Sequence, residues 1–349
     1  MCPMNSRALS TSLLVVIACA ASSCAGLAPT SDPAPVVRGP LSTRQQHPMA
    51  LTLMAFRPRR AVTQPEGEFG VGAQVAWATI EEIQRGPAYN PNETVAFDGE
   101  TLRTTLRTRY GLRQDLDIEV ELPFLYAWAG GMDQIIEEYH SVLGLPGGAR
   151  EFYPDDGYDM RVFSHGDELY SLEGNRLALQ DIPIFLTWQL TEEREEDPAI
   201  AARFGIELPT GSESGGFGNG ALDFGAGLLA EKSFHRWSVF GGFDWVVPGQ
   251  TDRLRNASGD HHYDPMLALN LSGEYRWNDS LSVIVGTVWT SRMVHSVALE
   301  EIDREVFDFG VGAAWDVAAD HRFQLSLHED LVAATGSDLT LQVGWTWGY

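Results

Sequence analysis

The chain has 349 residues and a formal net charge of −24, because 48 acidic residues outnumber 24 basic ones. Proteins that bind nucleic acid need basic patches for the phosphates, so this composition excludes nucleic acid as a partner. The same acidity excludes a peripheral protein that docks on anionic lipid headgroups.

The first residues have the order of a secretory signal peptide. Residues 1–12 carry Arg7 and no acidic residue, residues 13–21 are apolar, and small residues follow from Ser22. The apolar run is too short for a membrane helix, which needs about 20 residues. We therefore predict that residues 1–24 are a cleaved signal peptide and that the protein is exported.

All three cysteines, Cys2, Cys19 and Cys24, fall in this leader, so no disulfide is expected in the mature domain. Cys19 and Cys24 each follow residues typical of a bacterial lipoprotein processing site, where the cysteine becomes the acylated N-terminus. Cleavage after Ala25 without acylation is the alternative, and the sequence leaves these options open. Residues 25–46 are rich in Pro, Ser, Thr and Gly without apolar periodicity, which predicts a flexible periplasmic tether.

In the rest of the chain, apolar and polar residues alternate in segment after segment. In one segment Leu116 and Ile118 share one parity, while Asp117 and Glu119 share the other. A period of two residues indicates β-strands with one apolar and one polar face. About twelve such strands are joined by connections that are alternately short and long, as in bacterial outer-membrane barrels. The sequence therefore predicts an all-β fold for residues 67–349, a transmembrane, antiparallel, up-and-down β-barrel.

A soluble β-sandwich would also show alternating strands. Most of the ten tryptophans, however, lie on the apolar parity near strand ends, as an aromatic girdle at the membrane interfaces requires. The opposite parity holds Gly, Ser, Gln, Asp, Glu and Arg, which suit a wet lumen. We therefore favour the barrel.

The last strand, residues 339–349, alternates up to a terminal aromatic residue, Tyr349. It resembles the signal that the barrel assembly machinery reads, so this machinery and periplasmic chaperones are the expected partners during biogenesis. The folded protein is expected to be a monomer surrounded by outer-membrane lipid and lipopolysaccharide. A periplasmic C-terminus requires an even strand count and places the connection 128–175 outside the cell. The signal residues are Val343, Trp345, Trp347 and Tyr349.

A further alternating stretch precedes the barrel, with Met49, Leu51 and Leu53 on one parity. Counting it as a spanning strand would make the strand count odd. We therefore predict that residues 47–66 lie in the lumen or pair at the periplasmic rim.

Charges on the lumen parity of the first hairpin predict a cross-strand ladder. Folding about the turn near residue 114 places Arg109 near Glu119 and Arg107 near Glu121. The ladder is either structural, with charges that offset one another's desolvation, or a selectivity ring in a pore. Its members are Arg103, Arg107, Arg109, Asp117, Glu119 and Glu121.

The connection 128–175 contains one short predicted helix, because apolar residues recur there at helical spacing. Such a helix could constrict the barrel mouth, present a partner surface, or simply pack down its own loop. Asp155, Asp156 and Asp159 follow, but no regular calcium-binding loop is present. The helix residues that we single out are Ile135, Ile136, Tyr139 and His140.

Catalytic chemistry has one weak candidate, since Ser326 and His328 share a lumen parity with Glu329 beside them. A lipid hydrolase would use a serine, a histidine and an acid, but nothing in the sequence supplies an oxyanion hole. No phosphate loop, metal motif or nucleotide fingerprint is present, so no cofactor, metal site or catalytic residue is assigned.

The segment 39–48, Gly-Pro-Leu-Ser-Thr-Arg-Gln-Gln-His-Pro, is similar to the opening of the family called domain of unknown function 3187. Residues 133–140, Asp-Gln-Ile-Ile-Glu-Glu-Tyr-His, resemble an internal motif of the same family, and 208–211 is a weaker match. The resemblance runs from about residue 39 to the end. It implies an outer-membrane barrel and no particular activity, and it carries over no catalytic residue.

Three functions are compatible with this sequence. The leading hypothesis is a passive or gated pore for small solutes, because the lumen parity is polar. The second is a surface-binding or structural barrel that acts through the loop 128–175. The third is the lipid hydrolase.

Overall fold

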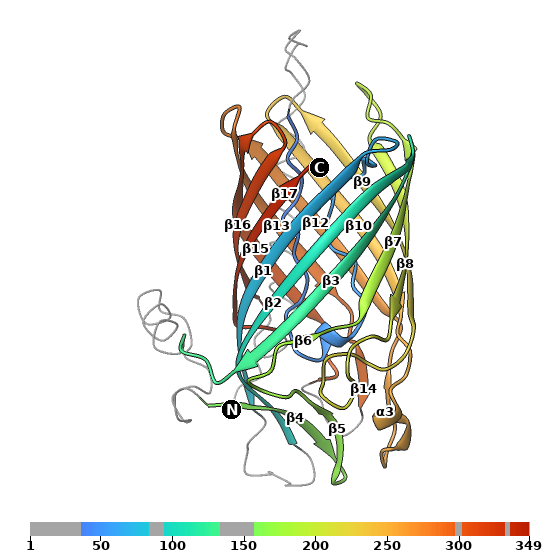
Figure 1. Cartoon of the computed structure of the whole chain (residues 1–349), viewed down its shortest axis with the longest axis vertical. Helices are drawn as coiled ribbons and strands as arrows, with labels where there is room; N and C mark the ends of the chain where they lie inside the picture. The colour runs from blue at the N-terminus through green and yellow to red at the C-terminus, as the bar shows by residue number, and fades with distance from the viewer. Residues whose placement is uncertain (1–35, 84–93, 133–156, 297–301, 332–335, 349) are drawn as a thin grey trace, which may run out of the picture. The chain divides into compact units, whose positions relative to one another are not determined.

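In the computed structural model, antiparallel strands form a closed barrel of twelve strands (Figure 1). The structure describes residues 36–83, 94–132, 157–296, 302–331 and 336–348. Strand β17 pairs with both β16 and β1, which closes the ring and confirms the predicted fold class. In chain order the barrel strands are β1 (Phe69–Ile83), β2 (Thr94–Arg113), β3 (Leu116–Trp128), β7 (Ile182–Thr191), β8 (Ala199–Leu208), β9 (Asp223–Phe234), β10 (Trp237–Val247), β12 (Met266–Arg276), β13 (Leu281–Thr290), β15 (Val306–Ala318), β16 (His321–Asp330) and β17 (Leu339–Trp347).

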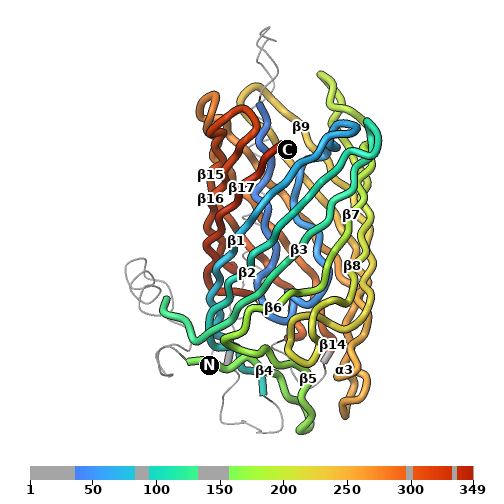
Figure 2. The backbone as a smooth tube through the Cα atoms, viewed as in Figure 1, coloured from blue at the N-terminus to red at the C-terminus, as the bar shows by residue number. Residues whose placement is uncertain are grey.

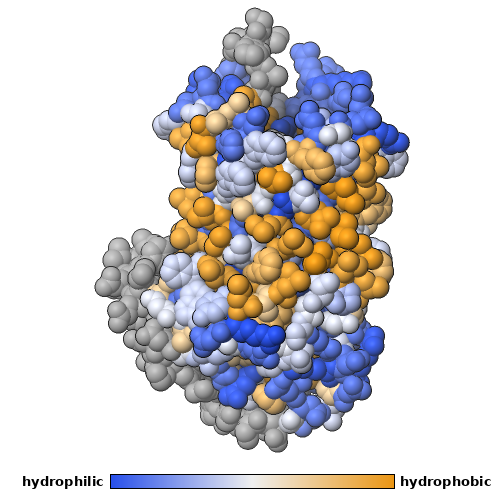
Figure 3. All heavy atoms as spheres, viewed as in Figure 1, coloured by the Kyte–Doolittle hydropathy of each residue, from blue (hydrophilic) through white to orange (hydrophobic). Residues whose placement is uncertain are grey.

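The outer face of the barrel is apolar because every second side chain points away from the lumen. Leu228, Phe243 and Leu269 lie side by side on β9, β10 and β12, and each is about half exposed. Figure 3 shows a band of apolar side chains across the middle of the barrel, with hydrophilic side chains above and below it. A continuous exposed apolar face of this kind belongs against lipid rather than water.

One end of the barrel, which we call the mouth, carries short strands in connections that are predicted to be loops. A hairpin forms there because His165 and Gly166 both have positive φ, 53° and 87°, as a tight two-residue turn requires. The other end carries the short turns, and we call it the turn end. The mouth elements are β4 (Asp159–Ser164), β5 (Asp167–Ser171), β6 (Ala178–Leu179), α3 (Asp252–Asn256), β11 (His261–Tyr263) and β14 (Val294–Ser296).

Helix is scarce in the described residues. Helix α3 lies in the connection between β10 and β12, and its N-terminus is capped by Thr251, whose side chain accepts a hydrogen bond from the Leu254 N–H. The helix predicted around Ile135 and Tyr139 lies outside the described residues. None of the described helices is long and apolar enough to cross a membrane.

The lumen holds residues 36–65, which we call the plug (Figures 1 and 2, blue). The plug starts at the turn end, where the Arg38 guanidinium donates to the Asp279 carbonyl. It runs to the mouth, turns back near η1 (Ala50–Thr52) and returns to the turn end. There the Gln64 side chain donates to the Gly348 carbonyl at 2.6 Å.

The tether that the sequence predicts over residues 25–46 is wrong for residues 36–46. Arg38, Leu41 and Gln46 are buried inside the barrel. A polar stretch without periodicity has the same sequence pattern whether it is bound by wall side chains or by water. The sequence therefore could not distinguish a lumenal segment from a solvated tether. Residues 25–35 and the predicted signal peptide lie outside the described residues.

The hydrophobic core sits at the mouth, where the tip of the plug packs beneath the mouth strands. Met54 and Leu53 are at most 1% exposed. Full burial of such a side chain contributes about 1.5–3 kcal/mol. The core therefore anchors the tip, whereas the two limbs have only small apolar clusters around Leu41 and Ala61 and are held mainly by polar contacts. Core members include Met49, Leu51, Phe56, Phe97, Phe185, Phe217 and Tyr170.

Candidate functional site

The predicted charge ladder exists as a set of lumen charges, but it pairs with the plug as well as with itself. The β2–β3 register places Arg109 opposite Glu119 and Arg107 opposite Glu121. Arg109 Nη2, however, pairs with Asp117 Oδ2 at 2.5 Å. Among the described residues Arg107 makes no ion pair, and its Nη1 donates to Ser42 Oγ of the plug at 3.1 Å.

Arginines of the returning limb supply the cations that the acidic half of the ladder needs. Arg57 pairs with Glu121 and donates to Gln74 Oε1 at 2.7 Å. Arg59 Nη2 lies 3.1 Å from Asp117 Oδ2, and its Nη1 donates to Thr187 Oγ1 at 3.0 Å. The last member, Arg103, donates to Gln180 and Thr105 instead of to a carboxylate.

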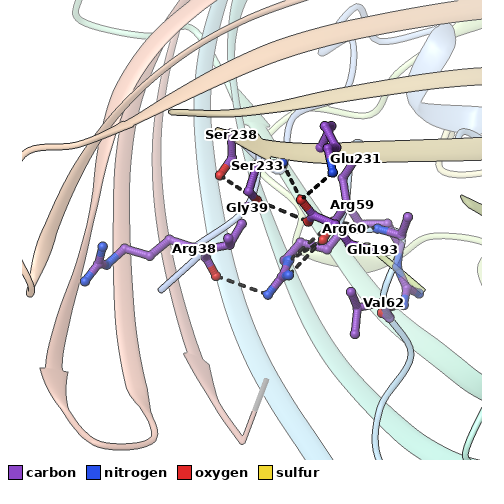
Figure 4. Close-up of polar contacts among 12 residues, drawn as sticks. Arg38, Gly39, Arg59, Arg60, Val62, Glu193, Glu231, Ser233 and Ser238 are labelled. Carbon is purple, nitrogen blue, oxygen red and sulfur yellow. Dashed lines mark hydrogen bonds and ion pairs between the residues drawn. The ribbon is translucent and has the colours of Figure 1, made fainter. Parts of the chain in front are cut away.

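A second group of contacts holds both limbs at the turn end. Glu274 accepts hydrogen bonds from the backbone N–H groups of Arg38 and Gly39, at 3.0 and 2.9 Å. Glu231 accepts from the Arg60 guanidinium at 2.8 Å and from the Ala61 N–H at 2.9 Å. Figure 4 shows Arg60 pointing at Glu231 in this region.

The Arg60 side chain also ties the two limbs together, because its Nη1 donates to the Val37 carbonyl at 3.2 Å. Wall glutamines hold the first limb nearby. Gln324 accepts from the Ser42 N–H at 3.0 Å and donates to the Pro40 carbonyl at 3.1 Å. Gln342 donates to the Ser42 carbonyl at 3.0 Å.

At the tip, the wall carboxylate Asp223 accepts from the Met54 N–H at 2.8 Å. The buried Arg203–Asp244 pair, 2.6 Å apart, supports the returning limb because Arg203 also donates to the Arg57 carbonyl. The Arg203 guanidinium lies 4.6 Å from the centroid of the Phe56 ring, a cation–π arrangement.

The mouth closes over the tip through Asp181, which lies outside the membrane-spanning strands. Its carboxylate accepts from the N–H groups of Gly211 and Asn219, at 2.7 and 3.0 Å. Burial raises the pKa of Asp181 to about 6, although these two hydrogen bonds act in the opposite direction and lower it. The protonation of this group near neutral pH therefore affects how the mouth loop is held.

Comparison with known proteins places the whole arrangement in a family. The family described as "Protein of unknown function (DUF3187)" matches residues 13–349. The chain belongs to this family. The resemblance stated from the sequence is thereby confirmed, and it supplies no activity. A search of curated proteins found no relative with significant similarity.

Among solved structures, the DUF3187 chain is similar to the COG4313 outer membrane channel from Pseudomonas putida F1. The TM-score is 0.55 with 16% identity, over 84% of this chain and 99% of that one. At this identity the likeness shows a shared fold. The KdgM porin (TM-score 0.41, 7% identity, 80% and 99% coverage) and the Pseudomonas putida toluene transporter TodX (0.37, 12%, 80% and 89%) are more distant.

The Ser326–His328 pair of this DUF3187 protein is buried in the lumen wall, with Ser326 Oγ 2.8 Å from His328 Nε2. The space beside it, lined by Leu41 and Thr43 of the plug and by Asp308, is too narrow to admit a water molecule. The described residues provide no hydrogen bond from an acid to His328. The pair is therefore a hydrogen bond in the lumen wall that the plug covers, and the described residues give it no acid partner.

The other predicted residues are dispersed. Val343, Trp345 and Trp347 lie on β17, and Tyr349 lies outside the described residues, as do the loop-helix residues and both cysteine candidates. Asp159 pairs with Arg161 at 2.6 Å. The described residues contain no group of metal-ligating side chains.

Sequence reasoning missed the plug arginines, which pair with the ladder carboxylates Asp117 and Glu121, and it missed the wall carboxylate Glu231. One signal was available. Residues 36–65 contain five arginines and no acidic residue, within a chain of net charge −24. A cationic segment next to an acidic barrel indicates that the two bind each other. The missed arginines are Arg38, Arg44, Arg57, Arg59 and Arg60.

Proposed function

We propose that this DUF3187 protein is an outer-membrane channel for small polar solutes, closed at rest by its plug. The observation that carries the proposal is that a separable segment, and not the wall's own side chains, occupies a polar lumen. The similar fold of the COG4313 outer membrane channel supports it. Of the passive and gated pores that the sequence allows, the plug favours the gated form.

The direction of opening follows from where the plug is attached. Both limbs reach the turn end, which we place in the periplasm because it holds the short turns and β17 ends there. The limbs are held mainly by hydrogen bonds and ion pairs, which water can replace, and by small apolar clusters around Leu41 and Ala61. Withdrawal toward the periplasm would also have to expose the apolar tip. Opening therefore needs a force or a partner that acts from the periplasm on the N-terminal end of the plug.

Planar-bilayer recording tests this proposal. The intact protein should show little conductance, and a variant lacking residues 36–65 should conduct. Ser42→Cys with Gln324→Cys provides the control, because the predicted mature domain has no other cysteine and the Gln324 side chain reaches the backbone N–H of Ser42 at 3.0 Å. This cysteine pair is introduced into a variant whose plug is loosened by Arg57→Gln/Arg59→Gln/Arg60→Gln. A short thiol crosslinker that joins the two cysteines should then abolish the conductance of that variant.

A non-conducting barrel is the second candidate, favoured by the buried core between the plug tip and the mouth. It predicts that the plug-free and loosened variants stay silent although they are folded. If neither variant conducts, although both show the heat-modifiable gel migration of a folded barrel, the channel is overturned in favour of this candidate.

A further inference from the structure

The wall of the lumen recognises the main chain of the plug, and this recognition does not depend on the plug's side chains. Wall carboxylates accept backbone N–H groups at several separate points along the plug. Wall glutamines complete the pattern by pairing with plug carbonyls or N–H groups. The carboxylates are Glu274, Glu231, Asp117 and Asp223, and the glutamines are Gln180, Gln189, Gln324 and Gln342.

The geometry of Gln324 is the clearest case. Its amide oxygen accepts from the Ser42 N–H at 3.0 Å while its amide nitrogen donates to the Pro40 carbonyl at 3.1 Å. A side-chain amide that pairs with both an N–H and a carbonyl of a chain matches the hydrogen-bonding groups that every peptide unit carries. Among polar solutes, uncharged sugars lack this regular order of donors and acceptors, whereas oligopeptides have it.

The wall also carries places for guanidinium groups. Arg57 reaches Glu121 and Gln74, and Arg60 reaches Glu231, whose side chain is 1% exposed. Buried carboxylates are costly without a cation, because desolvation is then uncompensated. Once the plug leaves, these carboxylates favour an occupant that brings positive charge.

We propose that the unplugged lumen binds extended, arginine-bearing oligopeptides, and that the plug is a built-in occupant of the same site. The inference rests on the proposed channel, since a peptide can enter only a lumen that the plug has left. It names the substrate class of that channel. The carboxylates and glutamines that hold the plug's main chain provide the general peptide contacts, and the acidic residues Glu119, Glu121 and Glu231 provide the preference for arginine.

The experiment uses a barrel that folds with its plug and loses it afterwards. Residues 65–68 are exposed, so a protease site inserted there can be cut in the refolded protein, and the plug can be washed out in moderate urea at high salt, which weakens its apolar and its ionic contacts. Binding of labelled peptides to the emptied barrel is then followed by fluorescence anisotropy. The peptides are the plug sequence 36–65, an unrelated peptide of equal length and arginine content, and the unrelated peptide with citrulline at each arginine.

Both arginine peptides should bind, and citrulline, which keeps the shape and removes the charge, should weaken binding by about tenfold or more. Glu121→Gln should weaken binding of the unrelated arginine peptide, whereas Glu305→Gln, at an exposed site on the Trp289 indole, should not. An uncharged trisaccharide should not compete. Binding of the plug sequence alone, equal binding of the citrulline peptide, or competition by the trisaccharide would overturn the inference.

Ion conductance of the same emptied barrel separates this inference from the channel. A barrel that conducts and binds no arginine peptide keeps the channel and overturns the peptide site. A barrel that binds the peptides and never conducts overturns the channel. Should the plug stay bound after cleavage, the Arg57→Gln/Arg59→Gln/Arg60→Gln plug with the same protease site provides the emptied barrel.

Discussion

Asp117 is a wall residue that holds the returning limb by both a side chain and a backbone N–H, and its replacement by asparagine tests the electrostatic argument. Its side chain is fully buried and accepts from Arg109 Nε at 2.7 Å, from the Gln64 N–H at 2.9 Å and from Arg59 at 3.1 Å. Asp117→Asn keeps the shape but removes the charge that both guanidinium groups face. Leaving buried charges uncompensated costs about 3–5 kcal/mol.

The assay is urea unfolding in lipid vesicles followed by tryptophan fluorescence, which gives the free energy of unfolding. Asp115→Asn is the matched control, because Asp115 pairs with Arg113 at 2.6 Å on the exposed turn of the same hairpin. Solvent screens that pair, so the control should change stability little. A double-mutant cycle with Arg59→Gln should give a coupling energy of about 1–3 kcal/mol between plug and wall. Equal effects of Asp117→Asn and Asp115→Asn would refute the reasoning.

Three further predictions concern the exterior, the lumen and the mouth. Phe243→Arg on the lipid face should lower the free energy of unfolding by about 2–4 kcal/mol in the same assay, and no change would mean that the residue faces water. The plug-free barrel should be cation-selective by reversal potential, and Glu119→Gln/Glu121→Gln should reduce that selectivity; anion selectivity would contradict the acidic wall. The raised pKa of Asp181, about 6 against an ordinary value of about 4, means that its contribution to stability is complete below about pH 4 and is lost as pH rises through 6. Asp181→Asn should therefore remove up to about 3 kcal/mol of pH dependence between pH 4 and 7, and an unchanged profile would contradict this assignment.

The barrel itself could be predicted from the sequence because its signal is local. Alternation within a strand identifies the face of each residue, and a short turn then specifies the register, as it does for Arg109 opposite Glu119. The mouth strands could not be predicted in this way. Strand β11 pairs with β14, about 30 residues further along the chain. Each of these strands has only three residues, too few to show an alternating pattern.

The plug shows what pattern reasoning cannot reach. Its apolar tip, with Met49, Leu51 and Leu53 on one parity, alternates like a strand, yet it forms the short 3-10 helix η1 and packs against the mouth without strand pairing. Its limbs are polar because they face polar wall groups, and a tether facing water has the same composition. Which arginine meets which carboxylate, such as Arg60 and Glu231, depends on distances that only the closed barrel defines.

The claim that the plug closes a channel is tested most directly by recording one refolded barrel with the protease site at residues 65–68 while protease is added to one side of the bilayer. Conductance should be low at first and should rise only after protease is added on the side of the turn end and moderate urea at high salt has released the plug. Unchanged low conductance after verified cleavage and loss of the plug would contradict the account, and so would a high conductance before cleavage.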